Sequence, residues 1–176
     1  VRAMAEVGTV SYDPNVRPAI IGPADEVRGQ IEELISLSEV VKASEEDVEW
    51  LYGDEPLESV MRRWLDSGVG LVVITQGGKG ASAMLSHSSE IVKIDPLDVP
   101  VADTVGAGDS FMGGLLSGLL DAGLIGSAET KEALRSASWD QVRPALDRAN
   151  GTSNVTVTHK GAYSPNREEV ADILAL

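Results

Sequence analysis

Hydrophobic and polar residues alternate along this chain in two different patterns, one typical of strands and one typical of helices. Residues 39–44 (EVVKAS) and 71–75 (LVVIT) are short apolar runs, and the second is apolar on both faces, which is typical of a central parallel strand. Segments 25–37 and 55–68 repeat apolar residues three and four positions apart, as amphipathic helices do. Because strands and helices alternate, the pattern predicts an α/β layered domain with a mostly parallel sheet.

The remaining elements are predicted by the same rules. Short strands are expected at 9–13 and 154–158, a hairpin at 80–86 and 89–95, and helices at 45–53, 127–138, 139–150 and 166–176. Ser44 and Asp47 form a capping-box pattern at the start of 45–53. Pro144 predicts a break or kink within 139–150. Residues 1–8 resemble the tail of a helix closed by Gly8. A helix tail at this place indicates a piece of a longer protein, with a frayed first helix as the alternative.

Composition narrows the possible functions. The chain has 176 residues, enough for one domain over 1–176, and at 43% hydrophobic it can form a core. A net charge of −14 argues against nucleic acid and membrane partners, which need clustered Lys and Arg. Without cysteine there is no disulfide or thiolate chemistry, and two histidines argue against a histidine-built zinc site. With neither a signal-peptide pattern nor a membrane-length apolar run, we expect a cytoplasmic protein.

A glycine-rich turn, DTVGAGDSF, leads into an apolar helix. Successive amides at Gly106, Ala107 and Gly108 can form an anion-binding concavity, which a helix N-terminus would strengthen. Asp109 follows them and can serve as a general base or as the helix cap, and the local sequence leaves both roles open. The Walker pattern is absent, and a dinucleotide fingerprint would need glycine where Phe111 stands.

A second glycine-rich turn, TQGGKGA, follows the buried strand 71–75. The Thr75 hydroxyl and the amides near Gly77 and Gly80 could bind phosphate, although a plain turn before a hairpin explains the same residues. Such turns matter because parallel sheets bind ligands beyond the carboxyl ends of their strands.

Two further polar turns also follow strands. In KASEED, Glu45 could hold Mg²⁺ through water and Lys42 could offset phosphate charge, or the acidic residues could simply favour the start of a helix. In DPNVRP, Asn15 and Arg17 could reach a substrate or phosphate, or form an ordinary surface turn. The strand-end turns together predict one shared site above the sheet.

The same segments, in this order, resemble a known family. DTVGAGDSFMGGLL resembles the C-terminal signature of the ribokinase, or PfkB, family of carbohydrate kinases. DPNVRP resembles a segment of its fructokinase-like members, and VVKASEED their version of the magnesium-associated motif, in which Lys replaces the Asn of ribokinases. VVITQGGKGA resembles the nucleotide-side strand and loop, and VTVTHKGAYSP the closing segment near the adenine and the monovalent ion.

The resemblance implies a ribokinase-like three-layer α/β/α sandwich and ATP-dependent phosphorylation of a sugar hydroxyl. It implies that Asp109 is the base that takes the proton of the hydroxyl. It also implies an anion hole at Gly106, Ala107 and Gly108, and sugar contacts at Asn15 and Arg17. The implied ATP contacts are Lys42, Thr75, Gly77, Gly80 and Asn150, with Mg²⁺ near Glu45. A monovalent cation such as K⁺ is implied at Asp103 and at backbone oxygens near Val105, Thr156, His159 and Gly161.

In the family, an N-terminal half and a β-sheet lid carry much of the sugar site, and neither is found in this sequence. We therefore expect a C-terminal portion that is feebly active alone, with a homodimer formed through the lid only in the full-length protein. A 2-keto-3-deoxygluconate kinase, a nucleoside kinase and a non-catalytic nucleotide-binding fragment are the alternatives.

Overall fold

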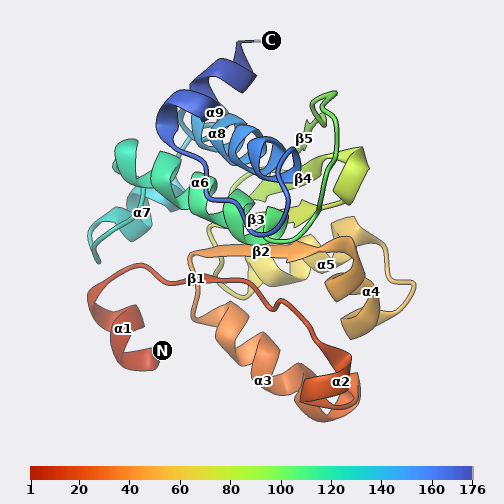
Figure 1. Cartoon of the computed structure of the whole chain (residues 1–176). Coiled ribbons are helices and arrows are strands. Elements are labelled where there is room, and N and C mark those ends of the chain that lie inside the picture. The colour runs from red at the N-terminus through yellow and green to blue at the C-terminus, as the bar shows by residue number, and fades with distance from the viewer. Residues whose placement is uncertain (176) are drawn as a thin grey trace.

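The computed structural model of the chain describes residues 1–175, which fold around one five-stranded sheet (Figure 1). The strands, in sheet order, are β1 (Ser11–Tyr12), β2 (Val40–Ser44), β3 (Leu71–Thr75), β4 (Ala81–Leu85) and β5 (Ile91–Ile94). Strands β1, β2 and β3 are parallel, whereas β4 runs antiparallel to β3, and β5 runs antiparallel to β4. The predicted parallel sheet is thus a mixed one, because its second half is the predicted hairpin.

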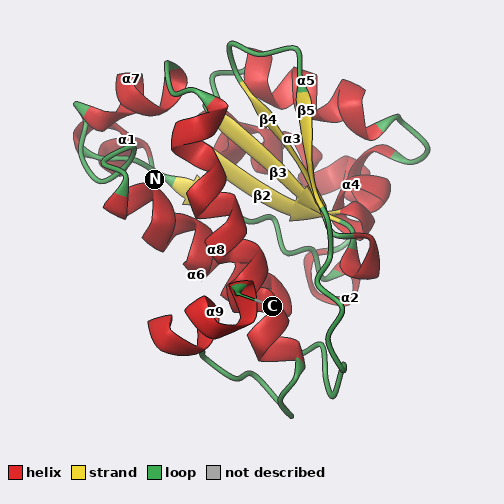
Figure 2. Ribbon diagram, turned by 90° about the horizontal axis from the view of Figure 1, so that it is seen from above, coloured by secondary structure: helices red, strands yellow, loops and turns green. Residues whose placement is uncertain are grey.

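Helices cover both faces of the sheet (Figure 2). They are α1 (Arg2–Val7), α2 (Pro18–Ile21), α3 (Ala24–Ser36), α4 (Glu45–Tyr52), α5 (Leu57–Asp66), α6 (Ala107–Asp121), α7 (Thr130–Arg135), α8 (Trp139–Val157) and α9 (Arg167–Leu174). Buried residues of α3, α4 and α5 form a cluster on one face of the sheet, and those of α6, α7 and α8 form a second cluster on the other. Helix α9 packs on α8, farther from the sheet.

Strand β3 shows why the sequence forms three layers. Leu71 and Val73 belong to the cluster under α6 and α8, and Val72 and Ile74 to the cluster under α3 to α5. All four side chains are completely buried, and successive strand residues point to opposite faces. A continuous apolar run therefore occupies the middle layer, and the expected three-layer α/β/α sandwich is confirmed.

The predicted strand at 154–158 is wrong, because these residues complete helix α8. Of the β-branched residues that suggested a strand, Thr156 and Thr158 bond their hydroxyls to the backbone of α8: Thr156 Oγ1 donates to the Thr152 carbonyl at 3.1 Å, and Thr158 Oγ1 to the Val155 carbonyl at 2.7 Å. The predicted break at Pro144 is also absent, since α8 runs through this exposed position without interruption.

Most other predicted boundaries agree with the structure within one to three residues, and the strand at 71–75 agrees at both ends. Helix α2 was not predicted, because it begins at Pro18 within a segment that resembles a turn. Within the described part of the chain, no helix is long and apolar enough to cross a membrane.

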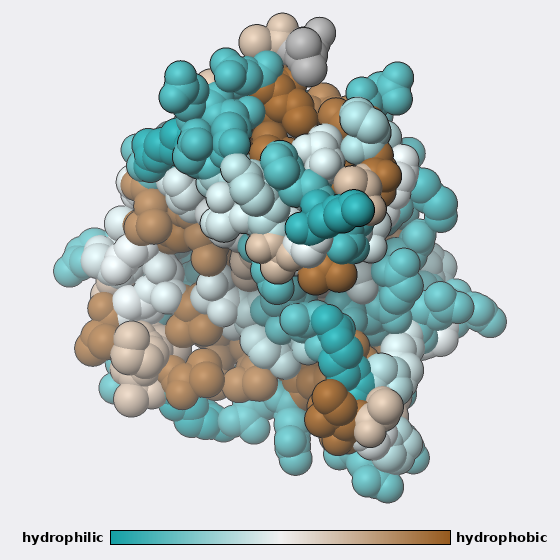
Figure 3. Space-filling model, viewed as in Figure 1, coloured by the Kyte–Doolittle hydropathy of each residue, from teal (hydrophilic) through white to brown (hydrophobic). Residues whose placement is uncertain are grey.

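The face in Figure 3 carries hydrophobic residues around α1 and α2, on the side of the sheet that ends at β1. Val1, Met4 and Val7 in and beside α1 are exposed, as are Ile20 and Ile21 in α2. Strand β1 pairs on one side only, with β2, so its other edge keeps free backbone groups.

Candidate active site

The polar turns after β1, β2 and β3 meet at one edge of the sheet, as expected for parallel strands. Ser44 at the end of β2 lies opposite Thr75 at the end of β3, and the β1 turn begins at Asp13. A cavity of about 630 Å³ opens above these strand ends and beside the N-terminus of α6. The sheet therefore places one large cavity where the sequence predicted a shared site.

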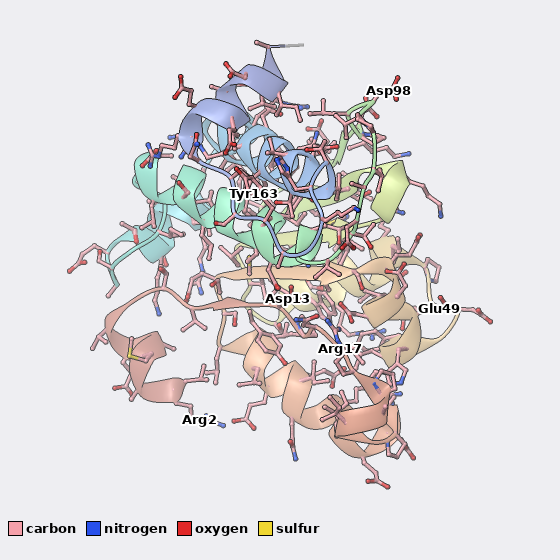
Figure 4. All side chains as sticks on the ribbon, in the orientation of Figure 1. Arg2, Asp13, Arg17, Glu49, Asp98 and Tyr163 are labelled. Atoms are coloured by element: carbon pink, nitrogen blue, oxygen red, sulfur yellow. The ribbon has the colours of Figure 1, made fainter. Side chains whose placement is uncertain are left out.

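Many residues singled out in the sequence line this cavity from different elements. They are Asn15, Arg17, Lys42, Thr75, Gly77, Gly80, Ala107, Gly108 and Asn150. Asn150 on α8 also donates to the Asp95 carbonyl at 3.0 Å, which fixes the segment after β5 as a wall of the cavity. Figure 4 shows Asp13 and Arg17 in the middle of the molecule, below the segment that leads into α6, and Asp98 on the loop that bounds the other side.

The turn before α6 is built by glycines. Gly106 is the N-cap of α6 in the left-handed conformation, at φ 81°, and a Cβ there would lie 3.1 Å from the Cβ of Ala162. Gly108 has no positive φ, but a Cβ there would lie 2.9 Å from Lys42 Nζ. Two glycines thus bring the chain close to its neighbours and leave the first amides of α6 unobstructed at the cavity edge.

Asp109 is the third residue of α6, and its side chain makes no capping hydrogen bond within the described chain. The carboxylate is exposed and lines a second cavity of about 610 Å³, together with Gly106, whereas Ala107 and Gly108 line the first. The α6 turn therefore separates two hollows, with the amides on one side and the carboxylate on the other. The role of helix cap, which the sequence left open, is not realised.

Lys42 lies on β2 with its ammonium at the floor of the first cavity. Its Nζ donates to Asp13 Oδ2 at 2.9 Å, and only 5% of the Lys42 side chain and 16% of the Asp13 side chain are exposed. The positive charge is thus buried, paired and next to the α6 turn, which suits contact with a phosphate group.

Glu45 connects two of the turns. Its Oε1 accepts from Gln76 Nε2 at 3.0 Å and its Oε2 from Lys79 Nζ at 3.2 Å. The Gln76 hydrogen bond, followed by that of Lys79, lowers the pKa of the Glu45 carboxyl below its usual value. The neighbouring Glu46 lines the cavity, whereas Glu45 does not.

The residues of the candidate cation site come together behind the α6 turn. Asp103 Oδ2 accepts from the Gly161 amide at 2.9 Å and Oδ1 from the Val105 amide at 3.1 Å, and these bonds lower its pKa. The hydroxyls of Thr156 and Ser110 are hydrogen-bonded, with their oxygens 2.7 Å apart, and the His159 ring stacks on Tyr163 with centroids 3.8 Å apart. Residues 156–163 therefore support the turn that leads into α6 through these contacts.

Sequence reasoning missed several residues of the site. Asp13, the partner of Lys42, was passed over as part of a turn, although its position directly after a strand was a usable signal. Asp47 was taken only as part of a capping box, which is present, but its Oδ1 also accepts from the buried Val16 amide at 2.8 Å. Ser153 and Asn154 line the cavity and were missed because their segment resembled a strand.

Comparison with known proteins supports this organisation. A fructokinase from Vibrio alginolyticus is 30% identical over 169 residues, covering 93% of this chain and 49% of the relative. A crystal structure of a fructokinase double mutant from Vibrio cholerae O395, with fructose, ADP and potassium ion bound, superposes with a TM-score of 0.77 at 30% identity, covering 94% of this chain and 50% of that one. A fructokinase structure from Xylella fastidiosa shares the fold, with a TM-score of 0.82 at 22% identity over 98% of this chain and 53% of that one.

The chain spans about half the length of these relatives. The sequence model of the pfkB family carbohydrate kinases matches residues 1–169, which include every strand and the α6 turn. This chain therefore belongs to the pfkB family of carbohydrate kinases.

Proposed function

We propose that this chain forms the nucleotide-binding and catalytic part of an ATP-dependent sugar kinase of fructokinase type. The main observation behind this proposal is the start of α6, where Ala107 and Gly108 line the first cavity and Asp109 lines the second. The bound fructose and ADP of the similar Vibrio cholerae structure support a hexose acceptor and an adenine nucleotide donor.

In the proposed reaction, the ATP phosphates lie over the glycine-rich turns at Gly77 and Gly80, with Asn150 toward the base. The transferred phosphoryl group meets the first amides of α6, whose N–H groups stabilise its developing negative charge. The buried Lys42 ammonium adds a positive charge at the same place. Asn15 and Arg17 offer polar contacts to the sugar from the β1 turn.

Asp109 completes the reaction as the general base. Its carboxylate accepts the proton of the sugar hydroxyl while the hydroxyl oxygen forms a bond to the γ-phosphorus, and the bond to the bridging oxygen of ADP breaks. The exposed Asp109 carboxylate directly follows the anion-binding amides in the first turn of α6, and for this role the acceptor hydroxyl is held at the junction of the two cavities.

The chain also offers positions for the two metal ions that the family resemblance implies. Mg²⁺ in such sites binds through one or two carboxylates together with phosphates and water, which fits ionised Glu45 beside Glu46. When bound, the ion neutralises phosphate charge. Asp103 and the backbone near Gly161 offer oxygens for a monovalent cation behind the anion hole, and the potassium ion of the Vibrio cholerae structure supports this proposal.

The test is turnover by the protein made from the complete reading frame that encodes this chain, with an ADP-release assay and a panel of hexoses, 2-keto-3-deoxygluconate and nucleosides. We expect Asp109→Asn and Asp109→Ala to lower kcat at least 1,000-fold, a loss at the upper end of single-group effects, ~10²–10⁴, while ATP affinity stays within threefold. Asp121→Asn is the matched control, because this carboxylate ends the same helix and only pairs with Arg148 and Arg167 on the surface.

Activity that survives either substitution at Asp109 would refute its assignment as the base. ATP binding without turnover of any acceptor would instead support the alternative of a non-catalytic nucleotide-binding domain. The acceptor with the highest kcat/KM identifies the substrate class.

A further inference from the structure

Asp13 makes a contact that the proposed reaction has not used. Its Oδ2 accepts from Lys42 Nζ at 2.9 Å, across the pair of strands β1 and β2. Both side chains are largely buried, and Lys42 is the deeper of the two. The ion pair therefore lies under the first cavity, directly below the turn that begins α6 (Figure 4).

The second oxygen of Asp13 holds the β1 turn. Oδ1 accepts from the Asn15 amide at 3.0 Å, and Asn15 has a positive φ of 43°, a left-handed conformation that Asn tolerates better than most non-glycine residues. The next residue, Val16, is fixed from the other side by Asp47. One carboxylate thus shapes the turn that presents Asn15 and Arg17 to the cavity.

The other neighbour of Lys42 is the anion-binding turn. A Cβ at Gly108 would lie 2.9 Å from Lys42 Nζ, so the ammonium lies against the backbone of α6. An ammonium has three hydrogen-bond donors, and Asp13 is its one side-chain acceptor among the described residues. Lys42 therefore keeps donors for an anion bound in the cavity.

We propose that Asp13 is a positioning residue for phosphoryl transfer, which fixes the Lys42 ammonium beside the α6 amides and couples it to the turn carrying Asn15 and Arg17. The inference rests on the proposed function. Its physical basis is preorganisation: a buried ammonium needs a partner before the nucleotide arrives, and a fixed partner keeps it aimed at the place where negative charge develops.

A purely structural ion pair is the competing explanation, and the chain contains a matched example. Glu39, beside the other end of β2, is 5% exposed and pairs with Lys131 at 3.2 Å, and its second oxygen accepts from the Val10 amide. This pair has the same chemistry and similar burial, but it lies away from the cavity. Glu39→Gln therefore reports what the loss of such a pair does to the fold alone.

The experiment is a double-mutant cycle in the protein made from the complete reading frame, with kcat and both KM values measured for unsubstituted, Asp13→Asn, Lys42→Met and doubly substituted protein. We expect Asp13→Asn to lower kcat at least tenfold and to change the KM for ATP less than threefold. In the Lys42→Met background, the same substitution should change kcat less than twofold. Glu39→Gln should leave kcat within twofold.

The inference is overturned if Asp13→Asn lowers kcat by the same factor with and without Lys42, or if Glu39→Gln lowers kcat as much. If Asp13→Asn does not fold, Asp13→Glu replaces it: the charge is kept but the ammonium shifts, so kcat should fall at least threefold, and an unchanged kcat overturns the inference. No turnover by the unsubstituted protein overturns the proposed function and this inference with it, whereas turnover with additive effects overturns the inference alone.

Discussion

Replacing Gly108 by alanine tests the geometry of the α6 turn with one methyl group. The built Cβ lies 2.9 Å from Lys42 Nζ, and ordinary contacts begin at 3.4 Å, so the ammonium must move by about 0.5 Å (3.4 − 2.9). Apart from its chain neighbours and the nearby backbone of α6, no other heavy atom of the described chain lies within 4 Å of this position, and Gly108 has no positive φ. The substitution therefore displaces Lys42 and leaves the rest of the fold in place.

The substitution should change the unfolding free energy little and lower kcat clearly. Alanine is better than glycine in a helix by about 0.5–1 kcal/mol, which offsets part of the weakened Lys42–Asp13 pair, so we expect unfolding free energy to change by less than ~1 kcal/mol. A 1 Å misplacement in a catalytic site can cost about 100-fold in rate. For half that shift we expect kcat to fall about tenfold, or ~1.4 kcal/mol of transition-state stabilisation.

The measurements are urea denaturation of the 176-residue chain and ADP release by the protein made from the complete reading frame. Gly113→Ala is the control, because it lies in the same helix with nothing within 4 Å of its built Cβ. It should stabilise the chain by up to ~1 kcal/mol and leave kcat unchanged. A kcat within twofold for Gly108→Ala, or a loss of more than ~2 kcal/mol of stability with normal kcat, would refute the placement of Lys42 against the turn.

Two further predictions concern packing and pH. Gly118→Ala should destabilise the chain by about 1–3 kcal/mol, because its Cβ would lie 2.5 Å from the Cα of Ala145 where α6 packs on α8. Urea denaturation of this variant and of Gly113→Ala checks this, and equal stability of the two variants would contradict it. The Gly161 amide lowers the pKa of Asp103 below its ordinary value of 3.8, so its stabilisation is present above that value and is lost as pH falls through the lowered pKa. The urea midpoints of unsubstituted and Asp103→Asn protein should therefore differ at pH ~6 and converge as the pH falls through the lowered pKa, and a constant difference would argue against the ionised carboxylate.

The sequence was informative wherever a residue's environment is set by its near neighbours. The run at 71–74 is apolar at every position, and only the middle layer of a sandwich buries both faces of a strand. Ser44 and Asp47 form the predicted capping box, because both partners lie within one turn of chain. The polar turns after the strands indicated one site, since parallel strands end at a common edge.

Other features depend on residues far apart in the sequence, and only the tertiary structure decided them. Asp13 and Lys42 are 29 positions apart and meet because β1 pairs with β2 in the register Tyr12 to Val41. The segment 154–158 is helical because α8 packs along α6, where Thr156 is fully buried. The local sequence alone left Asp109 an equal candidate for cap and base, and the fold places Gly106 at the cap position. Local patterns determine which residues are buried and where the chain turns, but long-range register and packing decide which side chains meet.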